Sequence, residues 1–351
     1  MKKQIIIVFL LFLFFWGYLG TTTSLSSAFN QTSATKIELG RYLFYDTRLS
    51  YNGTKSCSSC HDPQFAFTDG YRTSAGADGY NVKRNAPSLL NSRYNLSLTW
   101  ADSSIKSFES QMLFPLFNEH PKELGWKLNE QQIIRQIESV EFYRILFHKA
   151  FPNIQKPITL QNIITAIAKF EDQLVAFGSV YDDYLRGNKK AMNQTAIKGM
   201  QLFYSEKLGC GNCHRLTDKP ILNKFYNTGL YNIGEEGDYP TADQGLFEST
   251  KNSFDKGKFR VPSLRNVMIT APYTHDGTVA NIADMIDIYQ RGGRFIQDGE
   301  NRGDGKLNRN KSKLINGFSI SQQEKLSLIA FLSCLTDTSF MQQKKILNPF
   351  N

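Results

Sequence analysis

The chain has 351 residues, of which 41% are apolar and 21% are charged, which is enough for one large domain or two of ordinary size. This composition excludes a disordered protein, and no collagen or coiled-coil period runs through the sequence. The 41 Lys and Arg residues against 32 Asp and Glu give a net charge of +9, which by itself suggests an acidic partner, a membrane surface or a nucleic acid.

Residues 1–28 are predicted to be an export signal. Lys2 and Lys3 precede an apolar run over residues 5–19, and small polar residues follow that run. The run is short for a membrane span, which needs about 20 residues. Its cleavage pattern is weak, so an uncleaved anchor in the inner membrane stays open as an alternative. In both cases we expect the rest of the chain in the periplasm.

Four of the five cysteines stand in two C-x-x-C-H motifs, which run from Cys57 to His61 and from Cys210 to His214. This motif attaches c-type haem: two thiols bond the vinyl groups, and the histidine ligates the iron. A zinc site would need both cysteine pairs to meet at one metal. A redox pair or two small disulfides would leave both histidines unexplained. We therefore predict two covalently bound haems c, and we expect the fifth cysteine, Cys334, in an apolar core.

Two haems also change the charge balance. Removal of Lys2 and Lys3 with the signal lowers the net charge from +9 to +7. The four haem propionates then bring the mature protein to about +3, which argues against a nucleic-acid partner.

The sequence around the two motifs is repeated. Residues 43–61 resemble residues 202–214, and RNAPSLLN at 84–91 resembles RVPSLRN at 260–266. Such a repeat predicts two copies of one fold. The second copy contains an additional loop rich in Gly, Tyr and Asn, residues 228–248, whose composition predicts a surface excursion.

Helical spacing of apolar residues dominates the rest of the chain, and strand patterns are sparse. One long helix is predicted over residues 158–186, where it closes the first domain and ends at Gly187. Further helices are predicted over residues 194–204, 282–290 and 321–335. The predicted fold class is all-α: two cytochrome c-like haem domains, residues 34–187 and 188–345, that are related by duplication and have long connecting loops.

The repeat aligns candidate haem ligands. His275 in the second copy and Trp100 in the first lie thirteen residues after the proline of their Pro-Ser-Leu segments. Fourteen residues further on, the second copy has Tyr289 and the first has Phe114. Tyrosine can ligate iron and phenylalanine cannot. The second haem therefore has a candidate sixth ligand, whereas the first iron is open to peroxide at this position.

Several alternatives stay open at this point. Tyr289 is either that ligand or a packed aromatic whose hydroxyl bonds the backbone, and Met285 could ligate in its place. His120 and His148 could ligate the first iron, although His148 is more typical of a surface or packing position. A lone tryptophan such as Trp100 is more often a core residue than an electron relay, yet it stands between two motifs that are expected to contact haem.

From about Leu39 to Asp337 the chain resembles the bacterial di-haem cytochrome c peroxidases, and among them the MauG/MbnH-like branch. The resemblance rests on LGRYLFYDTRLSYNGTKSCSSCHDPQFAFTDG, KRNAPSLLN, PLFNEHPKELG, YNTGLYNIG and RVPSLRNVMITAPYTHDGT with IDIYQRGG. It implies an exported enzyme with two haems c that reacts with hydrogen peroxide.

The resemblance also implies ligands for the two irons. His61 and His214 would be the proximal ligands, and Tyr289 would be the second ligand of the second iron, where ordinary peroxidases have a methionine. Those peroxidases place a histidine ligand of the first iron where this chain has Ala77. We therefore expect a five-coordinate first haem that needs no reductive activation.

Further roles follow from the resemblance alone. Trp100 would relay electrons between the haems. Pro115 and Glu123 would line the peroxide pocket, with Glu123 as acid and base. Calcium would bind between the domains to three residues: Asn85, Thr270 (backbone) and Pro272 (backbone).

Two departures within the family bear on the substrate. Methylamine-utilisation members have a surface tryptophan two residues before the second motif, where this chain has Leu208. The EHPKELG segment is more similar to members that oxidise a tryptophan of a copper-binding partner. We expect oxidation of such residues on a partner protein through a bis-Fe(IV)-type state. The alternatives are detoxification of hydrogen peroxide with a small redox protein as electron donor, and a non-enzymatic di-haem electron carrier.

Overall fold

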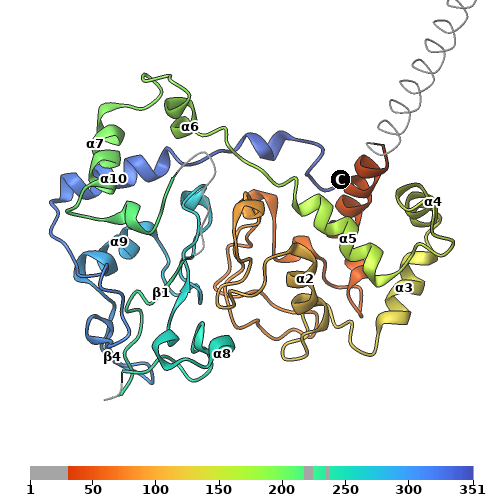
Figure 1. The fold of residues 1–351 in the computed structure, drawn as a ribbon, viewed down its shortest axis with the longest axis horizontal. Helices are drawn as coiled ribbons and strands as arrows, with labels where there is room; N and C mark the ends of the chain where they lie inside the picture. Colours follow the sequence, from red (N-terminus) through yellow and green to blue (C-terminus); the bar gives the residue numbers. More distant parts are fainter. Residues whose placement is uncertain (1–30, 217–223, 235–236, 351) are drawn as a thin grey trace, which may run out of the picture.

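The computed structural model describes residues 31–216, 224–234 and 237–350, and it shows two lobes side by side (Figure 1). One lobe contains the N-terminal half of the chain and the other contains most of the C-terminal half. The predicted signal, residues 1–28, lies outside the described residues. Within the described ranges, no helix is long and apolar enough to cross a membrane.

Helices provide most of the regular structure, so the predicted mostly helical class is confirmed. The chain is helical over residues 31–45 and in α2 (Phe108–Phe117), α3 (Glu130–Glu138), α4 (Glu141–Ala150), α5 (Leu160–Glu171), α6 (Val180–Leu185), α7 (Gln194–Tyr204), α8 (Phe247–Thr250), α9 (Ile282–Arg291) and α10 (Gln322–Ser333). Two short antiparallel ribbons pair β1 (Phe225–Tyr226) with β2 (Phe259–Arg260) and β3 (Phe295–Ile296) with β4 (Gly303–Asp304).

Local capping residues set the limits of the helices in the second lobe. The Asn193 side chain accepts a hydrogen bond at the start of α7, and Ser321 forms a capping box with Glu324 at the start of α10. Helix α9 ends at Gly292, which has the left-handed conformation that favours glycine. The helices predicted over residues 194–204, 282–290 and 321–335 are therefore confirmed, with shifts of one or two residues at their ends.

The single long helix predicted over residues 158–186 is wrong. Helix α5 ends at Glu171 and α6 begins only at Val180. Between them the chain pairs with a distant residue, because the Asn91 backbone N–H donates to Leu174 O (2.8 Å) and the Asn91 side chain bonds both backbone groups of Ala176. These tertiary bonds replace the helical ones that the local pattern predicts.

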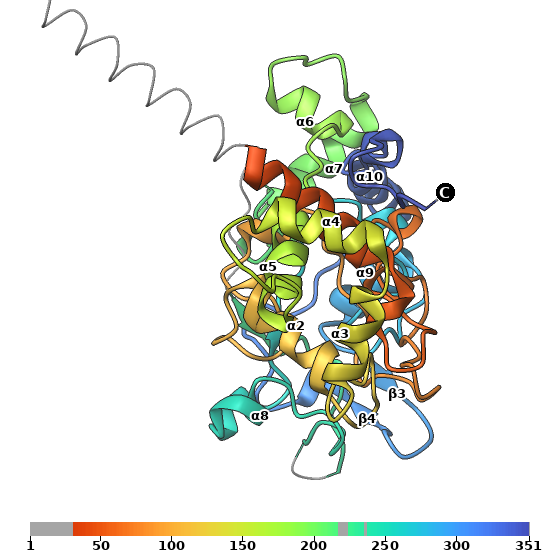
Figure 2. The same cartoon turned by 90° about the vertical axis from the view of Figure 1, so that its right-hand side faces the viewer.

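The same helix crossing occurs in both lobes. In the first, helix 31–45 crosses α5 at Gly40, where an added Cβ would lie 1.9 Å from the carbonyl oxygen of Ala166. In the second, α7 crosses α10 at Gly199, and the corresponding distance to Ser327 O is also 1.9 Å. Helices α7 and α10 lie side by side in both views (Figures 1 and 2). Only glycine permits such close contact between the two backbones.

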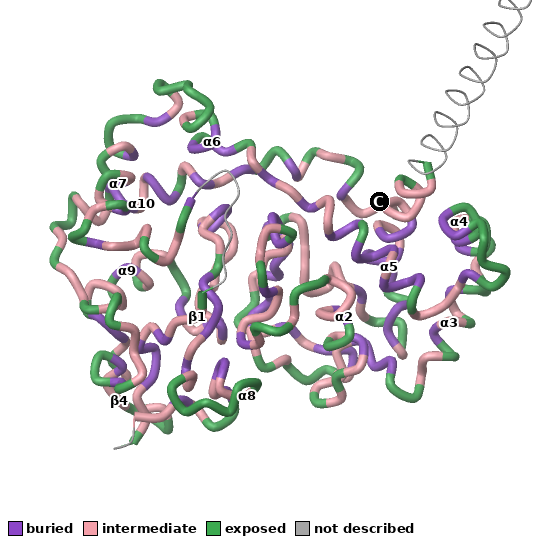
Figure 3. The backbone as a smooth tube through the Cα atoms, viewed as in Figure 1, coloured by how far each residue is buried: buried purple, intermediate pink, exposed green. Residues whose placement is uncertain are grey.

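A third apolar cluster lies apart from the cores of the two lobes, and it includes part of the loop 228–248. Leu230, Tyr231 and Tyr239 of this loop are buried there, and the cluster also contacts Trp100. The Tyr239 hydroxyl donates to Asn227 Oδ1 (2.9 Å). The expected surface excursion is therefore wrong, because its tyrosines are buried and hydrogen-bonded. Figure 3 shows buried stretches throughout both lobes.

The C-terminal segment returns to the first lobe. Phe340 and Ile346 belong to the core that is built from residues 39–176, and the Tyr45 hydroxyl donates to Ile346 O (2.7 Å). Accordingly, the C-terminus lies beside the helix of residues 31–45 in Figure 1. The end of the chain therefore connects the two lobes.

Candidate active site

The first C-x-x-C-H motif forms a tight turn that presents its histidine. Cys57–Ser59 is a short 3-10 helix, and the backbone N–H of His61 donates to Cys57 O (3.1 Å). The imidazole Nδ1–H donates to Phe67 O (2.8 Å), which leaves Nε2 available to a metal. Burial lowers the pKa of His61, so the ring is neutral, as a metal ligand requires.

The second motif repeats this geometry. Cys210–Asn212 is also a short 3-10 helix, and the His214 backbone N–H donates to Cys210 O (2.9 Å). Nδ1 of His214 donates to Pro262 O (3.1 Å), and burial lowers the pKa of this histidine to about 4. Both histidines are therefore oriented by backbone carbonyls and offer Nε2 to an iron.

The cysteine pairs fit haem attachment better than the alternatives. Cys57 packs against the core of the first lobe and Cys210 against that of the second, so the pairs do not converge on one metal. Burial raises the pKa of Cys60 and of Cys210 to about 11, which is the opposite of an activated redox thiolate. Thiols in such apolar surroundings suit thioether bonds to a haem. Cys334 is half-buried at the edge of the second core.

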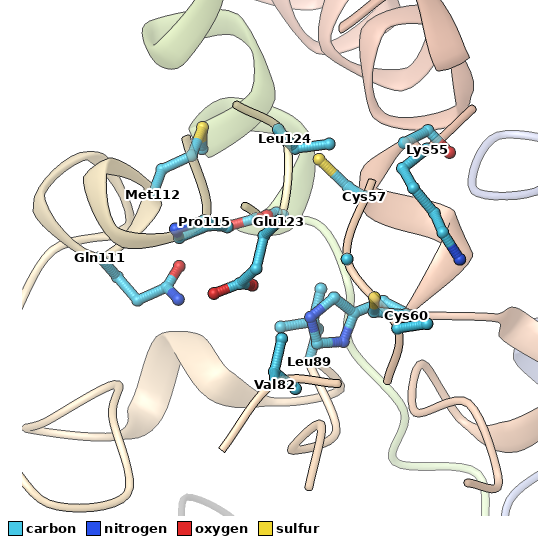
Figure 4. Close-up of a pocket in the computed structure, with 15 residues that line it drawn as sticks. Lys55, Cys57, Cys60, Val82, Leu89, Gln111, Met112, Pro115, Glu123 and Leu124 are labelled. Carbon is cyan, nitrogen blue, oxygen red and sulfur yellow. The ribbon is translucent and has the colours of Figure 1, made fainter. Parts of the chain in front are cut away.

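A cavity opens beside the first motif (Figure 4). Its volume is about 60 Å³. Its lining residues come from the motif, from the segment of residues 75–89, from helix α2 and the loop that follows it, and from the end of α5; among them are Cys57, Cys60, His61, Pro115 and Glu123. Figure 4 shows the Glu123 carboxylate beside the Gln111 side chain, with Cys57 and Cys60 on the other side of the view. The structure thus places the predicted attachment residues and the predicted acid/base residue around one cavity.

Glu123 is positioned by the segment that contains Ala77. The Ala77 backbone N–H donates to Lys122 O (2.8 Å) and to Glu123 O (3.0 Å), and the Lys122 backbone N–H donates to Asp78 Oδ2 (2.7 Å). Burial raises the pKa of the Glu123 carboxyl, and the Asn118 side chain opposes this effect. At Ala77, where ordinary peroxidases have a histidine, this chain therefore offers backbone bonds and no ligand.

Tyr289 lies on α9 and faces the second motif. Burial raises the pKa of its phenol, and the nearby Cys213 and Cys210 raise it further. Its hydroxyl makes no hydrogen bond with a described residue, unlike a packed tyrosine bonded to the backbone. Met285, one turn earlier, packs instead against the third apolar cluster. These contacts favour Tyr289 over Met285 as the ligand, which remains a prediction.

Trp100 packs beside residues of both lobes. Its indole N–H donates to Asn85 O (2.8 Å), and its carbonyl accepts from the Arg260 backbone (2.8 Å). The Arg260 guanidinium lies 5.9 Å from the centre of the indole ring. The relay of electrons between two haems through Trp100 remains a prediction.

Sequence reasoning missed Arg260. The repeat aligns it with Arg84, but Arg84 bonds Asp243 (2.7 Å) and Glu248 (3.2 Å), whereas Arg260 pairs with no carboxylate among the described residues. Arg260 is 5% exposed, and burial lowers its pKa to about 10. A buried guanidinium needs an anion. The carboxylate of a haem propionate would supply this anion for Arg260. Arg84 needs none, because Asp243 and Glu248 already neutralise it.

The remaining candidates lie away from the cavity. His120, His148 and Phe114 are exposed, so none of them is placed to ligate the first iron. His275 is buried and stacks on Phe259 with the ring centres 3.5 Å apart. Leu208 is buried, which is unlike a surface electron relay.

The calcium prediction concerns Asn85, Thr270 and Pro272. Asn85 is buried, its side-chain NH₂ donates to Tyr71 O (2.9 Å), and its Oδ1 bonds no described residue. Thr270 and Pro272 are half-buried. An oxygen without a partner fits a calcium ligand. The ion itself remains a prediction.

Comparison with known proteins shows the family of this chain. Residues 34–190 match the family of di-haem cytochrome c peroxidases. The cytochrome c551 peroxidase of Nitrosomonas europaea is 34% identical over 322 residues, which cover 91% of this chain and 85% of that protein. The chain belongs to the di-haem cytochrome c peroxidase family. This membership confirms the predicted enzyme class and the predicted two haems c, and we do not retain the alternative of a non-enzymatic carrier.

Other relatives place this di-haem peroxidase near the MauG proteins. The methylamine utilization protein MauG of Methylorubrum extorquens is 29% identical over 309 residues, with 87% of this chain and 79% of that protein covered. A solved structure described as a MauG-like protein associated with microbial copper homeostasis is 43% identical, with a TM-score of 0.87 over 90% of this chain and 93% of that one. The predicted resemblance is therefore confirmed.

Proposed function

We propose that this di-haem peroxidase is exported to the periplasm and uses hydrogen peroxide to oxidise residues, tryptophan among them, on a partner protein. The observation that carries the proposal is Tyr289, whose phenol lies near Cys210 and Cys213 and makes no hydrogen bond with a described residue. A tyrosinate ligand donates charge and favours a more oxidised iron than a thioether does. The MauG-like relative is associated with copper homeostasis, so we propose a copper-binding protein as the partner.

The first haem, when bound, supplies the iron with which peroxide reacts. With that haem bound, the Glu123 carboxylate would take a proton from one peroxide oxygen and return it to the other, which would leave as water. Pro115 fills the adjacent wall of the cavity without offering a ligand. Trp100 lies 5.9 Å from the Arg260 guanidinium and would relay electrons between the two sites, and Arg260 would balance the charge of a haem propionate.

Three further assignments belong to the same proposal. The two haem domains, expected over residues 34–187 and 188–345, arose by duplication, which the matching crossings at Gly40 and Gly199 support. Two residues pack across these expected bounds, because Tyr181 belongs to the core of the second lobe and Phe340 to that of the first. Asn85 Oδ1, which accepts no hydrogen bond from a described residue, binds calcium between the domains together with the carbonyls of Thr270 and Pro272. Residues 1–28 direct export and are cleaved, or else they remain as an inner-membrane anchor.

The proposal is tested by adding hydrogen peroxide to the purified diferric protein and recording its spectrum. Copper-binding proteins encoded beside this gene are then added, and mass spectrometry measures the oxygen that they gain. We expect a peroxide-dependent spectral change at both haems and added oxygen on a tryptophan of one partner. Two low-spin, six-coordinate haems that do not react with stoichiometric peroxide would refute the proposal.

Peroxide detoxification is the second candidate, and the 34% identity with a cytochrome c551 peroxidase supports it. This function predicts fast peroxide turnover with a reduced cytochrome c or a small copper protein as electron donor. Tyr289 opposes it, because a tyrosine ligand lowers the potential of the second haem, which would receive electrons from the donor. Steady-state turnover with reduced cytochrome c therefore discriminates between the two candidates.

A further inference from the structure

A second carboxyl lines the cavity of the first haem. Glu171, the last residue of α5, is 6% exposed, and its Oε2 receives no hydrogen bond from any described residue. Burial raises the pKa of this carboxyl to about 8, and the negative Glu109 on α2 contributes to the rise. A buried carboxyl without a partner destabilises a fold. This position therefore needs a reason other than packing.

The second lobe shows which residue occupies the equivalent buried position where no such cavity residue is needed. Asn91 N–H donates to Leu174 O in the first lobe, and Asn266 N–H donates to Leu335 O in the second. The next bond is repeated as well, since both asparagine Oδ1 atoms accept a backbone N–H two residues further along. This register matches Glu171 with Leu332, which is 4% exposed. The carboxyl is thus specific to the lobe that contains the cavity.

Among the described groups around Glu171, no cation forms an ion pair with its carboxylate. Helix α2 contributes Glu109, which is negative. The first motif contributes Cys57, Cys60 and His61, Lys55 lies just before it, and the loop after α2 contributes Glu123. No ion pair joins Lys55 to Glu171. In such a cavity, a change of charge on the haem acts strongly on the carboxyl, because little water screens it.

We propose that Glu171 is the proton-coupling group of the first haem. Its carboxylate takes up one proton from solvent when the ferric iron gains one electron from an external donor, and the carboxyl releases that proton when the electron leaves. Glu171 thus compensates the change of charge on the haem and takes no direct part in the reaction with peroxide. The proposal rests on haem attachment at the first motif and does not depend on which partner is oxidised.

The experiment is a spectroelectrochemical titration of the full holoprotein between about pH 5 and about pH 10. The two haems are resolved by the spin states that five- and six-coordination produce. Between the pKa values of Glu171 in the oxidised and reduced protein, we expect the midpoint potential of the first haem to fall by up to about 59 mV for each tenfold drop in proton concentration. The second haem, with Leu332 at the matching position, is the internal control.

Three variants decide the outcome. E171Q and E171L should remove the pH dependence of the midpoint potential of the first haem and leave that of the second haem unchanged. E171L introduces the leucine that the second lobe has at this position, so it still gives a result if E171Q folds poorly. E109Q should retain the slope but move it to lower pH. An undiminished slope in E171Q and E171L would overturn the proposal. Such a result would leave the reaction with peroxide, and hence the proposed function, intact.

Discussion

Replacement of Glu123 by glutamine is the sharpest test of the peroxide site. Glutamine keeps the size of the side chain and its contact with the Asn118 amide, but it cannot accept a proton. Positioned acid/base groups contribute about 10²- to 10⁴-fold to rate. We therefore expect E123Q to slow the reaction of the diferric protein with peroxide by about 10²- to 10⁴-fold, which corresponds to roughly 3–5 kcal/mol of barrier.

The pH dependence of this reaction has a definite sign. Burial raises the pKa of Glu123, and only the carboxylate can accept the peroxide proton. The wild-type rate should fall as the pH drops through this raised pKa, at a higher pH than for an ordinary glutamate near about 4.3. E123Q should lose this dependence, because no carboxyl then titrates at the position.

Stopped-flow absorbance at the haem bands measures the rate. Glu119 gives a matched control: it lies on the same loop, pairs with Lys127 (2.8 Å) and does not line the cavity. E119Q should react at the wild-type rate. If E123Q also reacts at the wild-type rate, or if E119Q is equally slow, then the assignment of proton transfer to Glu123 is refuted.

The remaining predictions concern the second lobe. Y289F should change the spectrum of the second haem, whereas M285L should not; the reverse result would make Met285 the ligand. D182N should destabilise the protein by about 3–5 kcal/mol, because it breaks the buried ion pair with Arg265 (2.7 Å), and thermal unfolding measures the loss. G199A should lower the melting temperature as well, since its Cβ would lie 1.9 Å from a carbonyl oxygen of α10; an unchanged value would contradict that crossing.

The haem motifs and most helix limits could be predicted because their signals are local. Two thiols and a histidine within five residues define the attachment site without any tertiary information. Helix α7 begins after Asn193 and α10 after Ser321, and each cap bonds a backbone N–H three residues away. Such contacts are contained in a short stretch of sequence, so periodicity and capping residues predict them correctly.

Failures occurred where a distant segment decided the structure. The break after Glu171 depends on Asn91, and the burial of Tyr239 depends on the chain around Asn227 and Gly257. Composition alone treats a loop rich in Gly and Tyr as solvated. The tertiary partner converts the same tyrosines into a core, and no local pattern in the loop reports that partner.

At Arg260 and Glu171 the two copies of the repeat differ in a way that only the structure explains. Arg84 and Arg260 align in sequence, and only the carboxylates of Asp243 and Glu248 distinguish their roles. Glu171 aligns with Leu332 once the hydrogen bonds give the register. The difference between two copies is therefore most informative where a charged residue replaces an apolar one at a buried position.

The two haem sites differ in side chains rather than in backbone. Both lobes have a glycine crossing and a histidine oriented by a carbonyl, yet the first cavity contains Glu123 and Glu171, whereas the second motif faces Tyr289. Buried carboxyls cost stability and are useful where protons move; a buried phenol donates charge to a metal. We therefore infer that proton chemistry belongs to the first lobe and storage of oxidising equivalents to the second. E123Q and E171Q should then leave the spectrum of the second haem unchanged, and Y289F should leave the proton dependence of the first unchanged.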